Sequence, residues 1–471
     1  MNHDKQARGF SRRQWLKTSG ATLASALGTT GLSSLMFAPG EAQASDYKAL
    51  VCVFLYGGND GLNTVTPTDM TRYNQYAAVR GALALPQSSL VGLAGSDYGL
   101  HPAMKPLAAA WSDKTLAPVF NVGPLWRPTT KAEYQAATTG SPLIPDSLFS
   151  HSDQQVLWQA SSTSAFWRTG WGGRAAQYMG TTNPVISVGG NARFGMSLQR
   201  SPLVVPGTPG SNFALEGLNP GMSRKSALDN IYAEAQSNAM LEAYASQHRT
   251  AVATSDRLGA LLKTQPGDAN ASAALNQAFA PLISQGKISA GIGAQLYQIA
   301  KMIEGNATVQ GNRQIFFAEH SGFDTHCNQI GTSVTSGTHA DLLGQLAKAM
   351  AAFNEAMKAI GMSQQVTLFT QSDFGRTVAV NNSRGTDHAW GNHHLVMGGA
   401  VRGGTTYGRY PELALTGPDD VGDGHGRWIP TLGVDQYAAT LLSWFGATDW
   451  HMGGILPNLK NFSQRSIGFL G

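Results

Sequence analysis

Several apolar runs of this sequence end in side chains that can bind metal ions. The run FFAEHSGFDTH finishes with Asp324 and His326, GGNDGLNT supplies Asp60, and SDFGRT supplies Asp373. A stretch downstream, RGTDHAWGNHH, adds His388. Carboxylates with imidazoles suit zinc, manganese or iron, and oxygen-rich sets suit magnesium or calcium. If these groups converge, they need a cation to offset their repulsion and desolvation, so we expect one or two divalent ions.

A largely parallel sheet would bring these groups to one edge. Apolar runs that read as buried strands cover residues 49–56, 116–123, 183–190, 313–322, 364–373 and 393–399. Amphipathic helices are predicted at residues 339–360 and 434–445. Strands that alternate with helices predict a three-layer α/β sandwich with a largely parallel central sheet. Ligands of such sheets bind beyond the carboxyl ends of the strands.

A hydroxyl nucleophile is expected beside the metal site. The stretch FSHSDQQVLWQ places Ser150 just before a probable helix, whose N-terminus favours an anionic ester. The alternatives are a plain loop serine at Ser150 and a helix cap at Ser152. A serine triad within this stretch is rejected, because adjacent residues cannot reach one another in the required geometry. Each aspartate alone can likewise be a helix cap, and a lone histidine is more often surface or core.

The composition fits a globular protein without a nucleic-acid footprint. The 471 residues include 42% apolar and 13% charged residues, unlike a disordered chain or a coiled coil. Most of the formal net charge of +4 comes from the first 44 residues. The remainder is nearly neutral, whereas nucleic-acid binding needs a clustered basic excess. Residues 223–306 read as almost wholly helical, which predicts a helical insertion or flank within one domain of residues 45–471.

The first 44 residues have the pattern of an export signal. An arginine pair, Arg12 and Arg13, precedes a mildly apolar segment, and AQA at residues 42–44 is a small-residue cleavage site. The pattern resembles a twin-arginine signal, and the segment is too weakly apolar for a stable membrane span. We therefore predict export by the twin-arginine translocation machinery, cleavage, and a periplasmic or secreted protein with no membrane span.

The motifs together resemble a family of twin-arginine-exported bacterial proteins of unknown function, grouped with the alkaline phosphatase–sulfatase superfamily. The resemblance rests on GGNDGLNT, FSHSDQQVLW, GFDTH, SDFGRT and GTDHAWGNHH and covers essentially the whole mature chain. It implies an alkaline-phosphatase-like fold with Ser150 as the nucleophile. The metal ligands that it implies are Asp60 and Asp373 for one ion, and Asp324, His326 and His388 for the other. The expected substrate-binding residues are Asn59, His151 and Arg376.

Two departures from the superfamily pattern bear on activity. Phe374 follows Asp373 where superfamily enzymes typically have histidine, and the spacing in DTH is shorter than usual. We expect a metal-dependent hydrolase of small phosphate or sulfate esters that uses Zn, Mn, Mg or Ca. The alternative is a non-catalytic periplasmic binding or assembly protein on a degenerate scaffold of the same kind.

Overall fold

Strand β1 (Lys48–Tyr56) is apolar on both faces, and this places it inside the main sheet. Successive side chains of a strand point to opposite faces. Val51 and Val53 accordingly enter one hydrophobic core, whereas Cys52 and Phe54 enter a second core on the other face. The strand therefore needs cover on both faces, which a single layer of helices cannot supply.

A computed structural model describes residues 46–213, 221–234 and 238–471 of the protein. The predicted signal at residues 1–44 lies outside the described residues. The main sheet runs in the order β13 (Leu432–Gly433), β5 (Leu116–Gly123), β12 (Asn392–Met397), β11 (Val366–Ser372), β1, β10 (Arg313–Ser321), β6 (Ile186–Ser187) and β7 (Leu203–Val204).

The sheet is largely parallel, with β12 as the exception. Strand β1 pairs in parallel with β10 and β11, and β6 continues the parallel order. Strand β12 is antiparallel to both of its neighbours, β11 and β5. The chain that leaves β11 therefore enters β12 at the same edge of the sheet. As a result, the segment between them lies at the edge where β1 and β10 also end.

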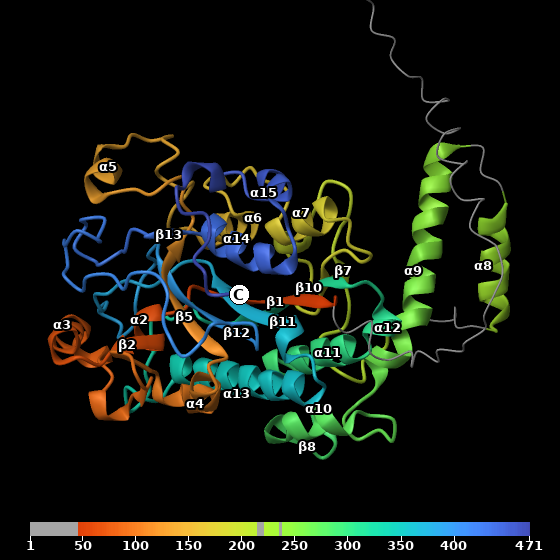
Figure 1. Ribbon diagram of the computed structural model, residues 1–471, viewed down its shortest axis with the longest axis horizontal. Coiled ribbons are helices and arrows are strands. Elements are labelled where there is room, and N and C mark those ends of the chain that lie inside the picture. The colour runs from red at the N-terminus through yellow and green to blue at the C-terminus, as the bar shows by residue number, and fades with distance from the viewer. Residues whose placement is uncertain (1–45, 214–220, 235–237) are drawn as a thin grey trace, which may run out of the picture. The chain divides into compact units, whose positions relative to one another are not determined.

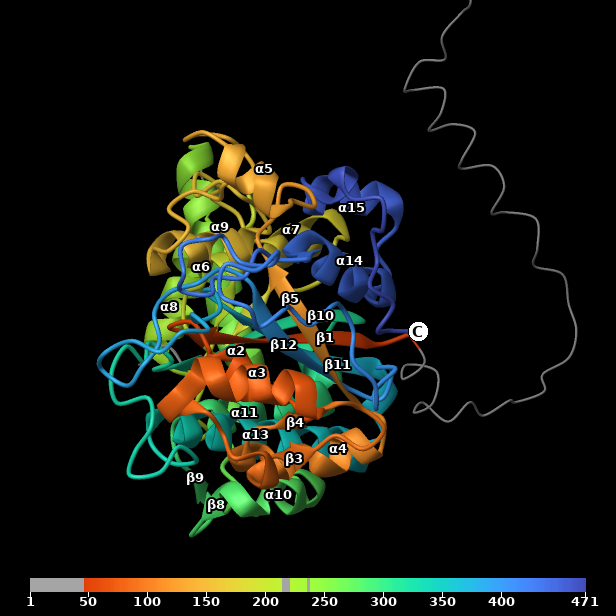
Figure 2. The ribbon, with the colours of Figure 1, turned by 90° about the vertical axis from the view of Figure 1, so that its left-hand side faces the viewer.

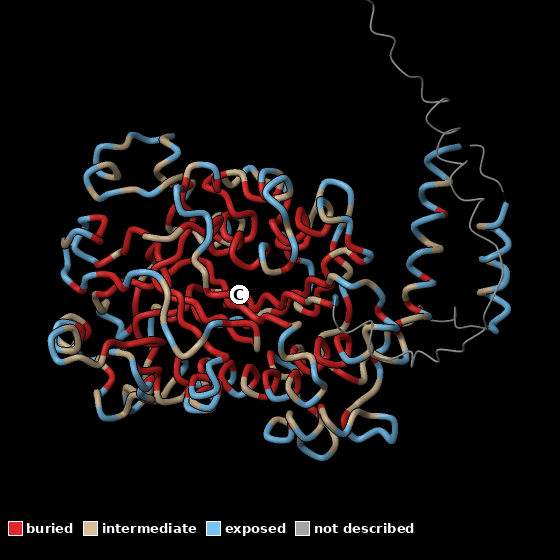
Figure 3. Tube along the Cα trace, in the orientation of Figure 1, coloured by how far each residue is buried: buried red, intermediate tan, exposed pale blue. Residues whose placement is uncertain are grey.

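Helices cover both faces of the sheet, which gives three layers (Figures 1 and 2). One face carries α4 (Ala108–Ser112), α10 (Ala273–Ala278), α11 (Ile292–Glu304) and α13 (Thr338–Ala359). The other face carries α6 (His151–Ala160), α7 (Trp171–Tyr178), α14 (Val434–Phe445) and α15 (Asp449–Ile455). Buried residues concentrate along the strands and the inner sides of these helices (Figure 3). The three-layer α/β prediction is confirmed.

The remaining elements are short or lie around the main sheet. The helices are α2 (Gly61–Thr64), α3 (Met70–Arg80), α5 (Lys131–Ala136), α8 (Ser223–Ala233), α9 (Ala239–Lys263) and α12 (Asn306–Val309). Two small sheets hold β2 (Val65–Pro67), β4 (Tyr98–Leu100) and β3 (Val91–Gly92), and β8 (Ile283–Ser284) with β9 (Lys287–Ile288). Within the predicted helical stretch 223–306, α11 packs into the core as a flanking helix. None of the described helices is both long and apolar enough to cross a bilayer.

Candidate metal centre

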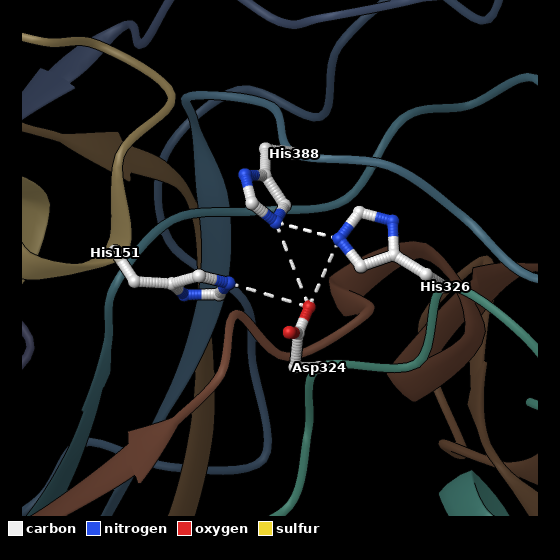
Figure 4. Close-up of side chains that lie close together, drawn as sticks. All are labelled: His151, Asp324, His326 and His388. Carbon is white, nitrogen blue, oxygen red and sulfur yellow. Dashed lines mark hydrogen bonds and ion pairs between the residues drawn. The ribbon is translucent and has the colours of Figure 1, made fainter.

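Four side chains bring one potential ligand atom each to a common point at this edge. They are His151, Asp324, His326 and His388, and no two of their ligand atoms are more than 4.8 Å apart (Figure 4). Oδ1 of Asp324 lies 3.3 Å from Nε2 of His151, 3.1 Å from Nε2 of His326 and 3.5 Å from Nε2 of His388. One carboxylate oxygen thus faces three imidazoles.

Three separate segments supply these ligand atoms. His151 is the first residue of α6, Asp324 and His326 follow β10, and His388 lies between β11 and β12. The loops after β1 and β10 run very close together. A Cβ on Gly57 (φ 110°) would lie 2.4 Å from the backbone nitrogen of Asp324, so only glycine fits there. The direction of β12 brings His388 to the edge where β10 ends.

Each imidazole is oriented by an acceptor on its far side. Nδ1 of His151 lies 2.7 Å from Asp373, and Nδ1 of His326 lies 2.7 Å from Asp387. Nδ1 of His388 lies 2.6 Å from the carbonyl oxygen of Phe149. These acceptors favour the tautomer that carries its proton on Nδ1, which leaves the Nε2 lone pair for a metal. Histidine ligands of metal sites are typically held in this way.

The Nε2 atoms of the two closest imidazoles lie so near each other that their lone pairs repel, and a bound cation would remove this repulsion. Nε2 of His326 lies 2.7 Å from Nε2 of His388. If both rings carry their protons on Nδ1, two lone pairs face each other at this distance. A shared proton would satisfy only this pair. Nε2 of His151 would still lack a partner, because this atom is buried and makes no hydrogen bond within the described residues. A metal ion would satisfy all three nitrogens.

The distances suit a small divalent ion. Ligand atoms about 2.0–2.1 Å from a tetrahedral zinc lie about 3.3 Å from one another. The three distances from Asp324 fall around that value, whereas the 2.7 Å between Nε2 of His326 and Nε2 of His388 is shorter, so these two rings would move apart around an ion. Three imidazoles with one carboxylate form a donor set that zinc accepts. The four side chains therefore fit a metal ion.

Asp324 is kept ionised by Arg376. Burial raises the pKa of Asp324, but the hydrogen bond and charge of Arg376 outweigh it, so the pKa lies below its usual value. The guanidinium Nη2 donates to Asp324 at 2.6 Å. Its other donors go to backbone carbonyls of Gly58 and Thr386 at 2.8 and 2.9 Å. Arg376, predicted to bind substrate, is instead occupied with the ligand carboxylate and the loop backbone.

The imidazoles differ in their proton affinity. The hydrogen bond with Asp373 is the main reason why the pKa of His151 lies above its ordinary value. Burial lowers the pKa of His388, which keeps that ring neutral and available as a ligand. The cluster remains partly open to solvent, because the side chain of Asp324 is 48% exposed and that of His326 is 40% exposed.

The structure does not bring Asp60 into this cluster. Its oxygens pair with Arg80 at 2.7 and 2.7 Å, and Gln329 donates a further hydrogen bond at 2.6 Å. Burial raises the pKa of Asp60, but Arg80 with its neighbours lowers it more, so the carboxylate stays ionised. Both oxygens are occupied by N–H donors. Asp60 is therefore placed as half of a buried ion pair and not as the predicted ligand.

Asp373 lies beside the cluster but behind His151. Its Oδ2 accepts from Nδ1 of His151, from Gln155 at 3.0 Å and from the backbone N–H of Gly57 at 3.2 Å. This geometry lets Asp373 orient a ligand without being one of the four. Among the described residues, the four-residue cluster is the only group of three or more ligand side chains close enough to hold an ion. The described residues contain no second cluster for the second ion that the sequence analysis allowed.

Ser150 and Asn59 occupy different surroundings. The N-cap position of α6 falls on Ser150 and not on Ser152, where a cap was the alternative, and Ser150 makes no side-chain capping bond. The Ser150 hydroxyl lies 3.1 Å from that of Ser152 and is exposed to solvent. Asn59 is buried, and its side-chain oxygen lies 3.1 Å from Nε2 of His339. Asn59 therefore has an internal partner in place of a substrate.

Phe374 fills the space on one side of the cluster. The side chain is fully buried, and its ring centroid lies 4.8 Å from that of His151 and 4.6 Å from that of His388. An apolar ring therefore packs against two ligands where the superfamily pattern would place another imidazole. This contact limits how far the two rings can turn.

Sequence reasoning identified Asp324, His326 and His388 as potential ligands, and the structure places all three in the cluster. It expected His151 to bind substrate, and the structure places the Nε2 atom of this ring as the fourth potential ligand atom of the cluster. It gave no role to Asp387, although an aspartate directly before a histidine was a signal for such a role. The carbonyl of Phe149 had no signal, because a backbone oxygen is present at every residue.

The solved structures that are similar to this chain include two crystal structures of Ps i-CgsB, one of them in complex with k-i-k-neocarrahexaose. They are 10% identical in sequence, with TM-scores of 0.35 and 0.33, over 88% of this chain and 77% of theirs. A likeness this low supports no argument about fold or function. No curated protein sequence matches the chain.

A family profile described as "Protein of unknown function (DUF1501)" matches residues 47–451. The match spans nearly all of the described residues, from the start of β1 to α15. It includes every segment that supplies a side chain to the cluster. The chain belongs to the DUF1501 family.

Proposed function

We propose that this protein is a metal-dependent hydrolase of phosphate or sulfate esters. The observation that carries the proposal is the meeting of three imidazole nitrogens and one carboxylate oxygen, each imidazole oriented from behind. His151, Asp324, His326 and His388 would hold one divalent ion. Such an ion supplies Lewis acidity that polarises an ester oxygen and stabilises the charge that develops on it.

The nucleophile that fits this site is Ser150. Its hydroxyl is exposed, is not used to cap α6, and belongs to the residue next to the ligand His151. The N-terminus of this ten-residue helix also favours an anionic group. Ser150 Oγ attacks phosphorus or sulfur, and the alcohol leaves with the serine proton. Water then cleaves the Ser150 ester, which releases phosphate or sulfate and restores the hydroxyl.

The finer parts of the proposal rest on the sequence. Likeness to the alkaline phosphatase–sulfatase superfamily is inferred from the motifs, and the α/β sandwich is compatible with it. Export by the twin-arginine machinery to the periplasm or beyond is inferred from residues 1–44. A small-molecule ester is the proposed substrate, since the chain after residue 44 is nearly neutral and lacks the overall basic excess typical of nucleic-acid-binding proteins.

A second candidate is a metal-holding protein of the envelope that binds its ligand without turnover. Phe374 favours it, because this ring packs on His151 and His388 where another metal ligand would be needed for a second ion. Catalysis by many ester hydrolases uses two ions to hold the attacking and leaving oxygens. A site with one ion lacks the second ion that would stabilise the charge on the leaving oxygen.

Elemental analysis of the purified mature protein tests the metal centre. We expect about one divalent ion per chain, and we expect Asp324→Ala and His388→Ala to lose it. His248→Ala, which changes a histidine on α9 outside the cluster, should keep it. Unchanged metal content in both cluster variants would contradict the proposal.

A panel of aryl phosphates and aryl sulfates, each assayed with Zn, Mn, Mg and Ca, separates the two candidates. The hydrolase predicts turnover that Ser150→Ala reduces by at least 10²-fold while metal content is unchanged. Metal bound at full occupancy with no turnover of any ester would favour the binding protein.

A further inference from the structure

The four-residue cluster depends on two loops keeping a fixed distance. One loop follows β10 and carries Asp324 and His326, and the other precedes β12 and carries Asp387 and His388. The loops touch at Gly385, where a Cβ would lie 2.4 Å from the backbone of His326. No main-sheet ladder joins these loops, so side chains and local backbone bonds must set their separation.

Besides Arg376, which donates to Asp324 and to the carbonyl of Thr386, the buried side chain of Gln329 joins both loops. Oε1 of Gln329 accepts a hydrogen bond from the hydroxyl of Thr325 at 3.2 Å and another from the hydroxyl of Thr386 at 2.8 Å. Thr325 lies between the two ligands of the first loop, and Thr386 directly precedes Asp387. Gln329 is 1% exposed, so these bonds are shielded from water. One oxygen thus bridges the two loops between their ligand residues.

The amide of Gln329 is held in one orientation by Asp60. Its Nε2 donates to Oδ2 of Asp60 at 2.6 Å, and Asp60 is itself fixed by the buried pair with Arg80. A carboxylate can only accept, so the NH₂ end of the amide must face Asp60 and the oxygen must face the threonines. The loop after β1 therefore serves as the rigid base of this arrangement.

We propose that Gln329 is a positioning residue of the metal centre: through Thr325 and Thr386 it sets the spacing of the two ligand loops and hence the affinity and geometry of the bound ion. The inference rests on the metal centre of the proposed function and adds residues that touch neither ion nor substrate. Glutamine suits the role because its amide combines a donor for a carboxylate with an oxygen that can accept from two hydroxyls.

The same contacts would exist if Gln329 only stabilised the fold, so the test must separate the two roles. The variants are Thr325→Val and Thr386→Val, which remove one hydroxyl each with little change of shape, and Gln329→Met, which removes all three side-chain bonds. Thr367→Val is the matched control. Thr367 is fully buried on β11, and its hydroxyl has no hydrogen-bond partner within the described residues.

Zinc affinity is measured by competition with a chelator, the geometry of the site by the visible absorption spectrum of the cobalt(II) form, and stability by thermal unfolding of the metal-free protein. We expect each threonine variant to bind zinc about 10–100-fold more weakly, the range seen for residues that orient metal ligands. We also expect a changed cobalt spectrum, with Gln329→Met at least as affected. Thr367→Val should match the wild type in both.

The outcomes separate this proposal from the one on which it rests. A wild-type protein that binds neither zinc nor cobalt would overturn the proposed function and the positioning role together. Wild-type binding, with unchanged affinity and spectrum in both threonine variants, would overturn the positioning role alone. The latter result together with a lower melting temperature of the metal-free variants would show that Gln329 serves only the fold.

Discussion

The ability of the cluster to bind a cation depends on the hydrogen-bond acceptor at Nδ1 of each imidazole. Asp387 accepts from Nδ1 of His326 and from Asn381 at 3.0 Å. Burial raises the pKa of Asp387, but these hydrogen bonds lower it more, so the carboxylate is ionised at neutral pH. An ionised acceptor strengthens the hydrogen bond that Nδ1–H of His326 donates, and this makes Nε2 of His326 a better ligand.

Removing this acceptor should therefore weaken metal binding without removing a ligand. We expect Asp387→Ala to bind zinc about 10–100-fold more weakly and Asp387→Asn to fall between it and the wild type, because the amide still accepts but is uncharged. Asp113→Asn, at a surface pair with Lys358, is the control. Competition with a chelator measures all of them, and an Asp387→Ala affinity equal to that of the control would refute the argument.

Two of the residues that sequence reasoning assigned to the site lie close to a strand end. Asp324 and His326 follow β10, so their position is fixed by one strand and a short loop. Asp60 also follows a strand, but its role depends on Arg80, which arrives through the fold of α3. The motif GGNDGLNT does not indicate that Arg80 contacts Asp60, because this contact arises only in the tertiary structure. Asp60 was therefore predicted to be a metal ligand.

The pair of Arg80 and Asp60 joins the end of helix α3 to the loop that follows strand β1. Both side chains are 0% exposed, and the pair is bidentate. A buried pair contributes little net stability, but breaking it leaves a charge without a partner in a dry environment. The loop after β1 therefore depends on a residue at the last turn of α3.

Replacing the arginine should destabilise the fold strongly. We expect Arg80→Met to lower the free energy of unfolding by about 3–5 kcal/mol. The double variant Asp60→Asn with Arg80→Met should recover part of this loss. The control is Arg72→Met on the same helix, whose partly exposed pairs with Asp69 and Asp97 should be worth about 0–1 kcal/mol. Urea unfolding measures each, and equal losses for the two arginines would contradict the argument.

At the level of secondary structure, long periodic segments were predicted well. Helix α14 has the predicted bounds, residues 434–445, and α13 lies within one residue of its prediction. The run at 183–190 was predicted as a strand of eight residues, but only Ile186–Ser187 pairs in the sheet. The reversed direction of β12 has no sequence signal, because a buried strand is apolar whichever way it runs.

Considered as a whole, the molecule carries ionisable groups deep in its second core. Asp435 in α14 is 1% exposed and accepts from the backbone N–H of Asn458 at 3.0 Å. Burial raises the pKa of Asp435 to about 7. A carboxyl with a raised pKa binds its proton more tightly in the folded state than in the unfolded state. Its contribution to stability is therefore present at low pH and is lost as the pH rises from about 4 to about 7.

The matching neutral variant should remove this pH dependence. We expect Asp435→Asn to equal the wild type in melting temperature near pH 4 and to exceed it at pH 8, because the amide carries no charge to bury. The control is Asp341→Asn at an exposed position of α13, which should follow the wild-type curve at both values. Thermal unfolding from pH 4 to pH 8 is the measurement. A constant difference between Asp435→Asn and the wild type would refute the assignment.

The two outermost strands of the main sheet have a consequence for association between molecules. Strands β13 and β7 contribute two residues each, whereas β1 and β10 inside the sheet contribute nine. An approaching chain would find very few free backbone groups to extend the ladder. Short outer strands of this kind guard against edge-to-edge aggregation, so we expect concentrated protein not to associate by extending this sheet.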